Sequence, residues 1–224
     1  MTLAMAVSFR GGALLAAGVD PREPGAEADA TPARPQSGAR PLRRVVKTPW
    51  GIVAGTAPAD VVGALRGLLH RASAPSPDDL LPFSREGGAG VEGSGVHARW
   101  LFTYEPPEPG DPRVWAGAAT PAPDASPGGM GAPISVYRSS THGPVRLSWG
   151  AVLLPEEFDA AAGREGTLRL HEAIVDDDDQ HARFAAVMDA FAWFAERSPG
   201  LLSEVDVGFH EQGHRYSVDR FAVG

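Results

Sequence analysis

The sequence predicts an α+β fold that combines antiparallel strands with helices. Two short apolar runs flank Arg10-Gly11-Gly12 near the start of the chain, a pattern typical of a β-hairpin. The stretch 180–197 carries large apolar residues at helical spacing and predicts a long amphipathic helix. The alternating segments 205–210 and 214–221 surround a Gly-containing turn and predict a closing hairpin.

The first half of the chain predicts a second hairpin and a helix. Residues 43–46 and 50–55 are rich in apolar side chains and flank a turn at Thr48-Pro49. A helix is expected to start near Pro58, because proline suits a first helical turn. The apolar residues that follow share one helical face, namely Val61, Leu65, Leu68, Leu69 and Ala72.

The middle of the chain is harder to assign. Residues 98–104 predict a strand, and 133–138 with 145–154 predict a third hairpin around Thr141-His142-Gly143. A short helix is expected over 155–162. These elements are separated by stretches in which proline and glycine dominate.

Length and composition predict one domain over residues 1–224. The chain holds 27 glycines and 21 prolines, so we expect long Pro/Gly-rich loops at 19–41, 73–96 and 105–132. The formal net charge of -8 disfavours binding to nucleic acid, because an acidic surface repels phosphate. No apolar run reaches the length of a membrane span, and no basic segment precedes the first apolar run, so a cytoplasmic protein is expected. The chain has no cysteine, which excludes disulfides, thiol catalysis and cysteine-ligated zinc.

The string His210-Glu211-Gln212-Gly213-His214 fits the H-E-x-x-H pattern of zinc peptidases. That chemistry needs both histidines on one face of a helix, together with a third ligand. Here the flanking residues alternate with period two, and Gly213 lies where a hairpin turns. We therefore expect a polar hairpin tip and no metal. The acidic run Asp176–Asp179 is likewise interpreted as a solvated helix start.

The amino terminus offers a different chemistry. If Met1 is removed, Thr2 becomes the first residue, and methionine is usually removed before a small side chain. A terminal threonine carries its own base, because its α-amino group, with an unperturbed pKa near ~8, lies beside its hydroxyl. The amine can take the hydroxyl proton, and the oxygen can then attack an amide. Thr2 is therefore the candidate nucleophile, and the sequence predicts no cofactor.

The same segment resembles the opening hairpin of proteasome β-type subunits and their bacterial relatives, which are N-terminal nucleophile hydrolases. The resemblance rests on Thr2-Leu-Ala-Met-Ala-Val, on the Gly-Gly-Ala-Leu-Leu-Ala-Ala that follows, and on residues 44–46 with 50–55. It implies a four-layer αββα sandwich of two antiparallel sheets with helices on both outer faces. It also implies hydrolysis of a peptide or amide substrate and assembly into a homo-oligomer.

The chain departs from this family at two positions. Gly18 stands where the family places an acidic residue, with Asp20 two positions later, and Arg44 stands at the active-site lysine. An arginine stays charged and supplies positive potential, but its pKa is too high for it to shuttle protons. The resemblance thus implies that Thr2 attacks, Arg44 stabilises charge and Asp20 orients Arg44. The single lysine, Lys47, is expected to face the other side of its strand.

Two other functions stay open at this stage. The fold can serve as a catalytically inactive scaffold or binding subunit, because two partners of the nucleophile are altered. An acidic inhibitor, such as an immunity protein that neutralises a basic toxin, would also suit the net charge of -8.

Overall fold

A computed structural model gives the structure of this chain. It describes residues 3–19, 43–56, 59–71, 100–105, 114–119, 135–137, 150–154, 160–175, 177–198, 200 and 202–223. Within these residues the helices are α1 (Ala59–Arg71), α2 (Ala160–Ala173) and α3 (Gln180–Arg197). The strands are β1 (Ala4–Phe9), β2 (Gly12–Val19), β3 (Val45–Thr48), β4 (Gly51–Gly55), β5 (Trp100–Tyr104), β6 (Trp115–Ala119), β7 (Ser135–Tyr137), β8 (Gly150–Leu153), β9 (Glu204–Glu211) and β10 (Arg215–Ala222).

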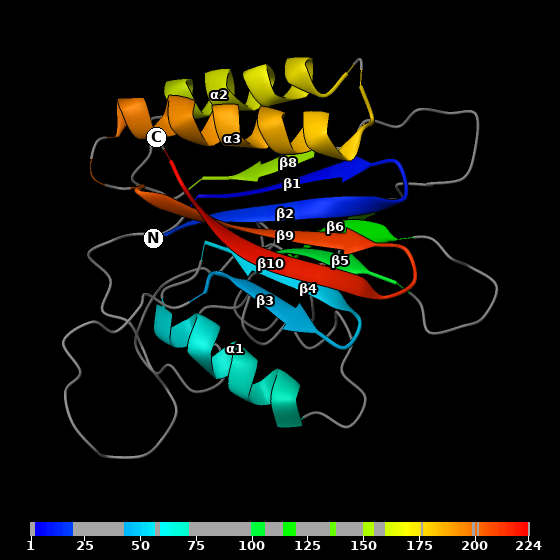
Figure 1. Cartoon of the computed structure of the whole chain (residues 1–224). Coiled ribbons are helices and arrows are strands. Elements are labelled where there is room, and N and C mark those ends of the chain that lie inside the picture. Colours follow the sequence, from blue (N-terminus) through cyan, green and yellow to red (C-terminus); the bar gives the residue numbers. More distant parts are fainter. Residues whose placement is uncertain are drawn as a thin grey trace.

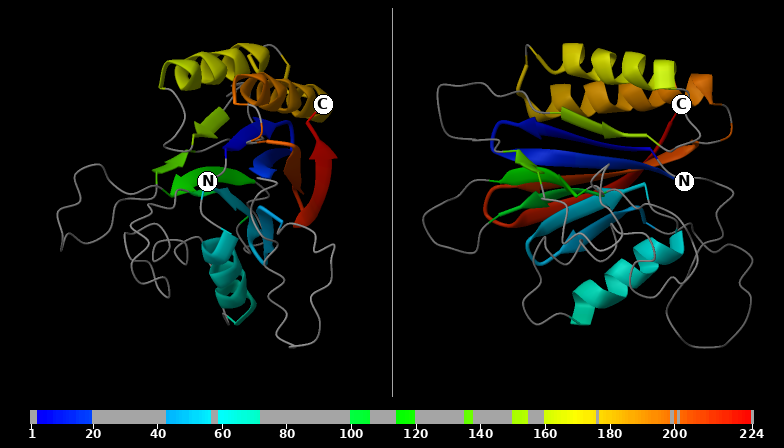
Figure 2. Two further views of the ribbon diagram at one scale, coloured as in Figure 1. Left: turned by 90° about the vertical axis from the view of Figure 1, so that its left-hand side faces the viewer. Right: turned by 180° about the vertical axis from the view of Figure 1, so that it is seen from behind.

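The strands form two antiparallel sheets that stack on each other. The first sheet has the order β10-β9-β2-β1-β8, and the second has the order β3-β4-β5-β6-β7. Helices α2 and α3 cover the outer face of the first sheet, and α1 lies against the outer face of the second (Figures 1 and 2). This arrangement confirms the predicted α+β sandwich with helices on both outer faces.

Burial on both faces explains why the first two strands read as nearly continuous apolar runs. One face of β1 and β2, including Met5 and Leu14, packs against α2 and α3. The other face, including Ala4, Ala6 and Ala17, packs against the second sheet. Because neither face meets water, the strands show no polar alternation. The small alanines between the sheets leave room for the side chains of the second sheet.

Local elements form where the sequence predicts them. The first, second and closing hairpins are confirmed, with the registers Ala4↔Ala17, Val45↔Ala54 and Arg215↔Glu211. Helix α3 covers the predicted stretch 180–197, and the Asp179 carboxylate caps it by accepting from the His181 backbone N–H at 2.8 Å.

Three expectations for the middle of the chain were wrong. The predicted third hairpin does not exist, because β7 pairs with β6 in one sheet and β8 pairs with β1 in the other. Strand β6 lies within 105–132, which was predicted to be loop throughout. Helix α2 runs over Ala160–Ala173, well beyond the short helix expected at 155–162. Val19, the first residue of the predicted loop at 19–41, belongs to β2, and the rest of that loop and the predicted loop at 73–96 lie outside the described residues. Within the part of the chain that the structure describes, no helix is long and apolar enough to cross a membrane.

Candidate active site

Strand β1 lies between β2 and the edge strand β8 in the first sheet. Thr2 and Asp20, two of the three predicted catalytic residues, lie outside the described residues. Leu3, which follows Thr2, is buried, and its carbonyl accepts from the Gly18 N–H at 2.9 Å. On the next rung Ala4 pairs with Ala17, and Ala17 pairs with Asp206 of β9.

Arg44, the third predicted residue, is described and is 1% exposed. It directly precedes β3 in the second sheet, and its backbone N–H donates to Oδ2 of Asp206 at 2.6 Å. This contact joins the two sheets close to the rung on which β1 begins. The structure therefore brings Arg44 next to a buried carboxylate that the sequence reasoning had not identified.

Asp206 is the centre of a charged cluster, although its side chain is fully buried. The Arg220 guanidinium donates to both carboxylate oxygens, with distances of 2.7 Å from Nε to Oδ1 and 2.9 Å from Nη2 to Oδ2. Arg43 adds a third charged contact at 3.3 Å. Hydrogen bonds to Asp206 hold the pKa of Arg220 above its usual value. The buried charge is thus paired and hydrogen-bonded, as burial requires.

Gly18 cannot be the site of a catalytic acid in this fold. A Cβ atom at Gly18 would lie 2.2 Å from Cδ2 of Leu202 and 3.6 Å from Cε1 of Phe191. The position therefore faces the apolar layer beneath α3, away from the Arg44–Asp206 contact. A side chain at position 18 would therefore be packed among apolar residues beneath α3.

Lys47 does not replace Arg44. Its side chain is exposed, and Nζ donates to the backbone carbonyl of Tyr216 on β10 at 3.2 Å. Arg44 is buried, so the two cations have different surroundings, as their spacing along the strand predicts.

The His210–His214 string forms a hairpin, which confirms the prediction against a zinc-peptidase helix. His210 is in β9, and the turn places Gly213 and His214 at φ angles of 86° and 54°. Within the described residues, no group of three acidic, histidine or cysteine side chains is arranged to hold a metal ion. His214, at the turn, is exposed, whereas His210, at the end of β9, is fully buried.

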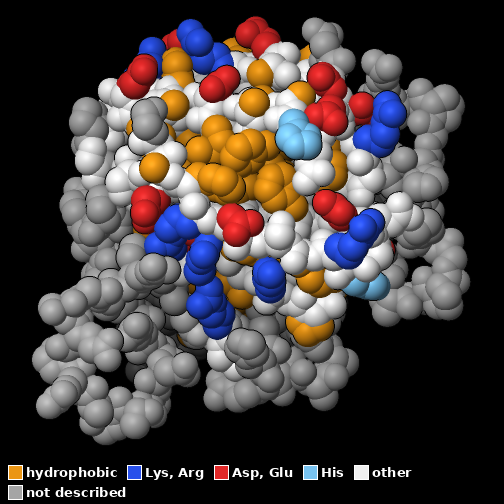
Figure 3. All heavy atoms as spheres, viewed as in Figure 1, with side chains coloured by type: hydrophobic (Ala, Val, Ile, Leu, Met, Phe, Trp, Pro, Cys, Tyr) orange, Lys and Arg blue, Asp and Glu red, His pale blue; other side chains and the backbone are white. Residues whose placement is uncertain are grey.

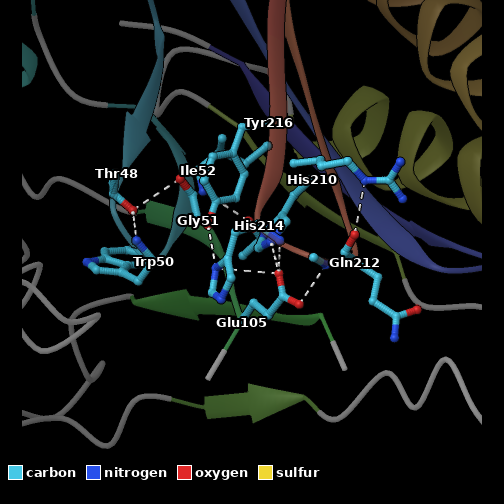
Figure 4. Close-up of polar contacts among 12 residues, drawn as sticks. Thr48, Trp50, Gly51, Ile52, Glu105, His210, Gln212, His214 and Tyr216 are labelled. Carbon is cyan, nitrogen blue, oxygen red and sulfur yellow. Dashed lines mark hydrogen bonds and ion pairs between the residues drawn. The ribbon is translucent and has the colours of Figure 1, made fainter. Parts of the chain in front are cut away.

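A hydrogen-bonded chain runs from His210 into the second sheet (Figure 4). Its Nδ1 lies 2.7 Å from Oγ1 of Thr103 on β5, and its Nε2 lies 3.3 Å from Oε2 of Glu105. Thr103 Oγ1 also accepts from the backbone N–H of Ile52 at 3.0 Å, so its own hydrogen is free to be donated to Nδ1. The Nε2 atom then carries the imidazole proton and donates it to the carboxylate.

Glu105 also holds the turn between β9 and β10. Its carboxylate accepts from the backbone N–H of Gly213 at 2.8 Å and of His214 at 2.5 Å. Burial alone would raise the pKa of Glu105, but these bonds and the one from His210 outweigh burial and hold the pKa below its usual range. Burial lowers the pKa of His210 to about 4 against the opposing effect of Glu105. At neutral pH the carboxylate is therefore charged and the imidazole is neutral.

The order hydroxyl–imidazole–carboxylate resembles a catalytic triad, but its surroundings do not suit catalysis. Thr103 and His210 are fully buried, and Glu105 is 4% exposed. The Thr103 hydroxyl is shielded from solvent and already hydrogen-bonded to Ile52 and His210, so it cannot reach a substrate carbonyl. We interpret these three residues as a polar link between the sheets. The signal in the sequence was that Thr103 and His210 interrupt apolar strands and that Glu105 directly follows one.

Comparison of the sequence with models of known protein families finds no match, and a search of curated proteins finds none either. Comparison with solved structures does find similarity. A Gly-1 mutant of Anbu from Hyphomicrobium sp. strain MC1 matches 99% of this chain and 88% of its own chain, with a TM-score of 0.60 and 12% sequence identity. At that identity the likeness establishes the fold and leaves the chemistry open. The chain shares the sandwich fold of Anbu.

Proposed function

We propose that this protein is an amide or peptide hydrolase that uses Thr2 as an N-terminal nucleophile. The proposal rests chiefly on the position of β1, an interior strand of the first sheet whose first residue, Ala4, lies on the same rung as Asp206, the buried partner of the Arg44 backbone. A nucleophile at the start of this strand would enter a preorganised, positively charged environment. The likeness in fold to Anbu and the sequence resemblance support a distant proteasome-like relationship.

The proposed chemistry needs the bond before Thr2 to be cleaved. The freed α-amine takes the proton of the threonine hydroxyl, and the oxygen attacks the carbonyl carbon of the substrate. Arg44 contributes positive potential that stabilises the developing negative charge, and its high pKa keeps it from acting as the base. The amine of Thr2 is the proton acceptor in this step; as an ammonium it then returns the proton to the leaving amine while the C–N bond breaks, and water hydrolyses the resulting ester to release the acid and restore the Thr2 hydroxyl. Asp20 remains the predicted partner that orients Arg44.

A non-catalytic scaffold or binding subunit is the second candidate. It is favoured by Gly18, whose surroundings are apolar and exclude the acid of the family, and by arginine at the lysine position. In this alternative the Arg44–Asp206 contact holds the sheets together without serving a nucleophile. Self-association remains part of both proposals.

The test is the intact mass of the purified protein before and after incubation with a peptide epoxyketone. This reagent bonds to both the hydroxyl and the free amine of a terminal threonine. Active protein is expected to lack Met1 and to gain one reagent mass, whereas Thr2→Ala gains none and Thr2→Ser still reacts. Arg44→Lys should react at least as fast as the natural protein, because lysine restores the family residue. Loss of Met1 without labelling of either the natural protein or Arg44→Lys would favour the scaffold, and retention of Met1 would end the catalytic proposal.

A further inference from the structure

A basic groove lies between the edge strands of the two sheets. Strand β3 is the edge of one sheet, β10 is the edge of the other, and α1 flanks them. The groove has a volume of about 330 Å³ and is lined by Arg43, Val45, Val46, Lys47, Arg66 and Val218. Figure 3 shows Lys and Arg side chains gathered over this part of the surface. None of the lining residues described by the structure is acidic, although the whole protein has a net charge of -8.

The positive charge of the groove exceeds the negative charge that is available to neutralise it. Asp206, beneath the groove, receives a bidentate pair of bonds from Arg220 and one longer contact from Arg43, and Glu204 adds a contact to Arg220 at 3.5 Å. Two carboxylates thus face the four cations Arg43, Lys47, Arg66 and Arg220. Arg66 donates to the backbone carbonyl of Arg43 at 3.2 Å, and Lys47 donates to that of Tyr216. These carbonyls carry no charge, so Arg66 and Lys47 both retain donors and a full positive charge for an incoming anion.

The environment of Arg66 adds a second reason to expect a ligand. Burial lowers the pKa of Arg66, an effect that the charge of Asp206 opposes only in part. Desolvating a cation without a directly bonded carboxylate is unfavourable, and a bound carboxylate would compensate for it.

The remaining wall of the groove is apolar. Val45, Val46 and Val218 lie between the cations, so the groove suits a carboxylate that is carried on a short hydrocarbon stem. The Nζ of Lys47 donates to the carbonyl of Tyr216 on β10, so this edge strand lies directly beside the cation that lines the groove. An edge strand with accessible backbone groups can pair with an extended peptide.

We propose that the groove between β3 and β10 binds an acidic peptide in extended conformation, with glutamate or aspartate carboxylates held by Lys47 and Arg66. The peptide is a partner or a docked segment of a substrate, and its binding does not require Thr2 to be reactive. Lys47 and Arg66 supply the charge, the valines contact the stem, and the edge strand aligns the backbone.

The test uses the full chain and a fluorescent peptide of alternating glutamate and valine, acetylated and amidated at its ends. Binding is measured by fluorescence anisotropy at low and high salt. We expect saturable binding that weakens with salt, because exposed charges are screened. The double variant Lys47→Gln/Arg66→Gln should weaken binding by about tenfold, from two partly exposed charge pairs. Lys47→Arg should retain binding, and Arg169→Gln, which removes an exposed charge on α2, should leave it unchanged.

Further peptides test whether binding depends on side-chain carboxylates or on a terminal carboxylate. A glutamine–valine peptide with amidated ends should not bind, and the same peptide with a free C-terminus tests whether a terminal carboxylate suffices. Equal binding of the capped glutamine peptide, or unchanged binding in the double variant, would overturn the proposal. So would stronger binding of the free terminus than of the glutamate side chains, or complete competition by inorganic phosphate at the peptide's own concentration. Melting temperatures confirm that each variant is folded, and a Thr2→Ala protein that binds normally separates this result from the proposed hydrolysis.

Discussion

The imidazole of His210 lies 3.3 Å from the carboxylate of Glu105, and both side chains are almost completely shielded from solvent. The carboxylate is kept ionised by three hydrogen bonds, whereas burial keeps the imidazole neutral. Since the two residues come from different sheets, protonation at this point is coupled to how the sheets hold together.

The stability of the protein should fall as the pH drops from about 6.5 to about 4. The pKa of His210 is lowered from 6.5 to about 4 in the folded state, so between these values the unfolded chain binds a proton that the folded chain does not. The contribution of His210 to the free energy of unfolding is complete above its unfolded pKa and decreases by up to about 3 kcal/mol as the pH approaches its folded pKa. Glu105, whose pKa is also lowered, acts in the same direction at still lower pH. Urea denaturation at a series of pH values measures the slope.

A histidine variant isolates this effect. His210→Gln should lose most of the slope between pH 6.5 and 4, because no titrating group remains at the position. His181 serves as the control, since its side chain is 96% exposed, and His181→Gln should keep the natural slope. An unchanged slope in His210→Gln would show that other groups cause the pH dependence.

Neutralising Glu105 should loosen the turn between β9 and β10. The carboxylate accepts from the backbone N–H groups of both Gly213 and His214, and Glu105→Gln leaves one amide oxygen for two donors and the imidazole. Hydrogen exchange at these two amides should become at least tenfold faster, while exchange in the middle of β1 stays slow. Glu211→Gln is the matched control, because this neighbouring carboxylate is partly exposed and bonds to neither amide. Equal acceleration in both variants would contradict the assigned role.

The sequence predicts the elements that depend on neighbouring residues. It does not predict which strands pair when they lie far apart along the chain. The hairpin around Gly11 and the helix over 180–197 each follow from adjacent residues, and both are present. Strands β7 and β8 are near in sequence, yet each joins a different sheet, which no local pattern indicates. Asp206 and His210 alternate with apolar residues and so suggest a face toward water. They are buried because a second sheet covers that face, which periodicity in one strand cannot predict.

Introducing an acid at Gly18, where the proteasome β-type subunits that the sequence resembles carry one, should destabilise the fold instead of creating an active site. The new Cβ would meet Leu202 and Phe191, so the carboxylate of Gly18→Asp would be buried among apolar groups without a partner. The unfolding free energy should fall by about 2–4 kcal/mol. Gly18→Ala separates the steric cost of the new Cβ from the cost of burying a carboxylate, since Leu202 can shift to admit a methyl group at a smaller cost. A stable Gly18→Asp protein with faster epoxyketone labelling would refute this account.

Removing the charge of Asp206 should be among the most damaging single changes in the chain. The Arg220 guanidinium binds both carboxylate oxygens, and the backbone of Arg44 donates to the same group. In Asp206→Asn an amide NH₂ replaces one acceptor and faces arginine donors, and the partly buried guanidinium of Arg220 is left with the longer contact to Glu204. The expected loss of unfolding free energy is about 3–5 kcal/mol, as for other broken buried ion pairs. Asp219→Asn, on the exposed face of β10, should change it by less than about 0.5 kcal/mol. If the two variants proved equally stable in urea denaturation, the cluster around Asp206 would not hold the sheets together, and the positive environment proposed for Thr2 would lose its structural basis.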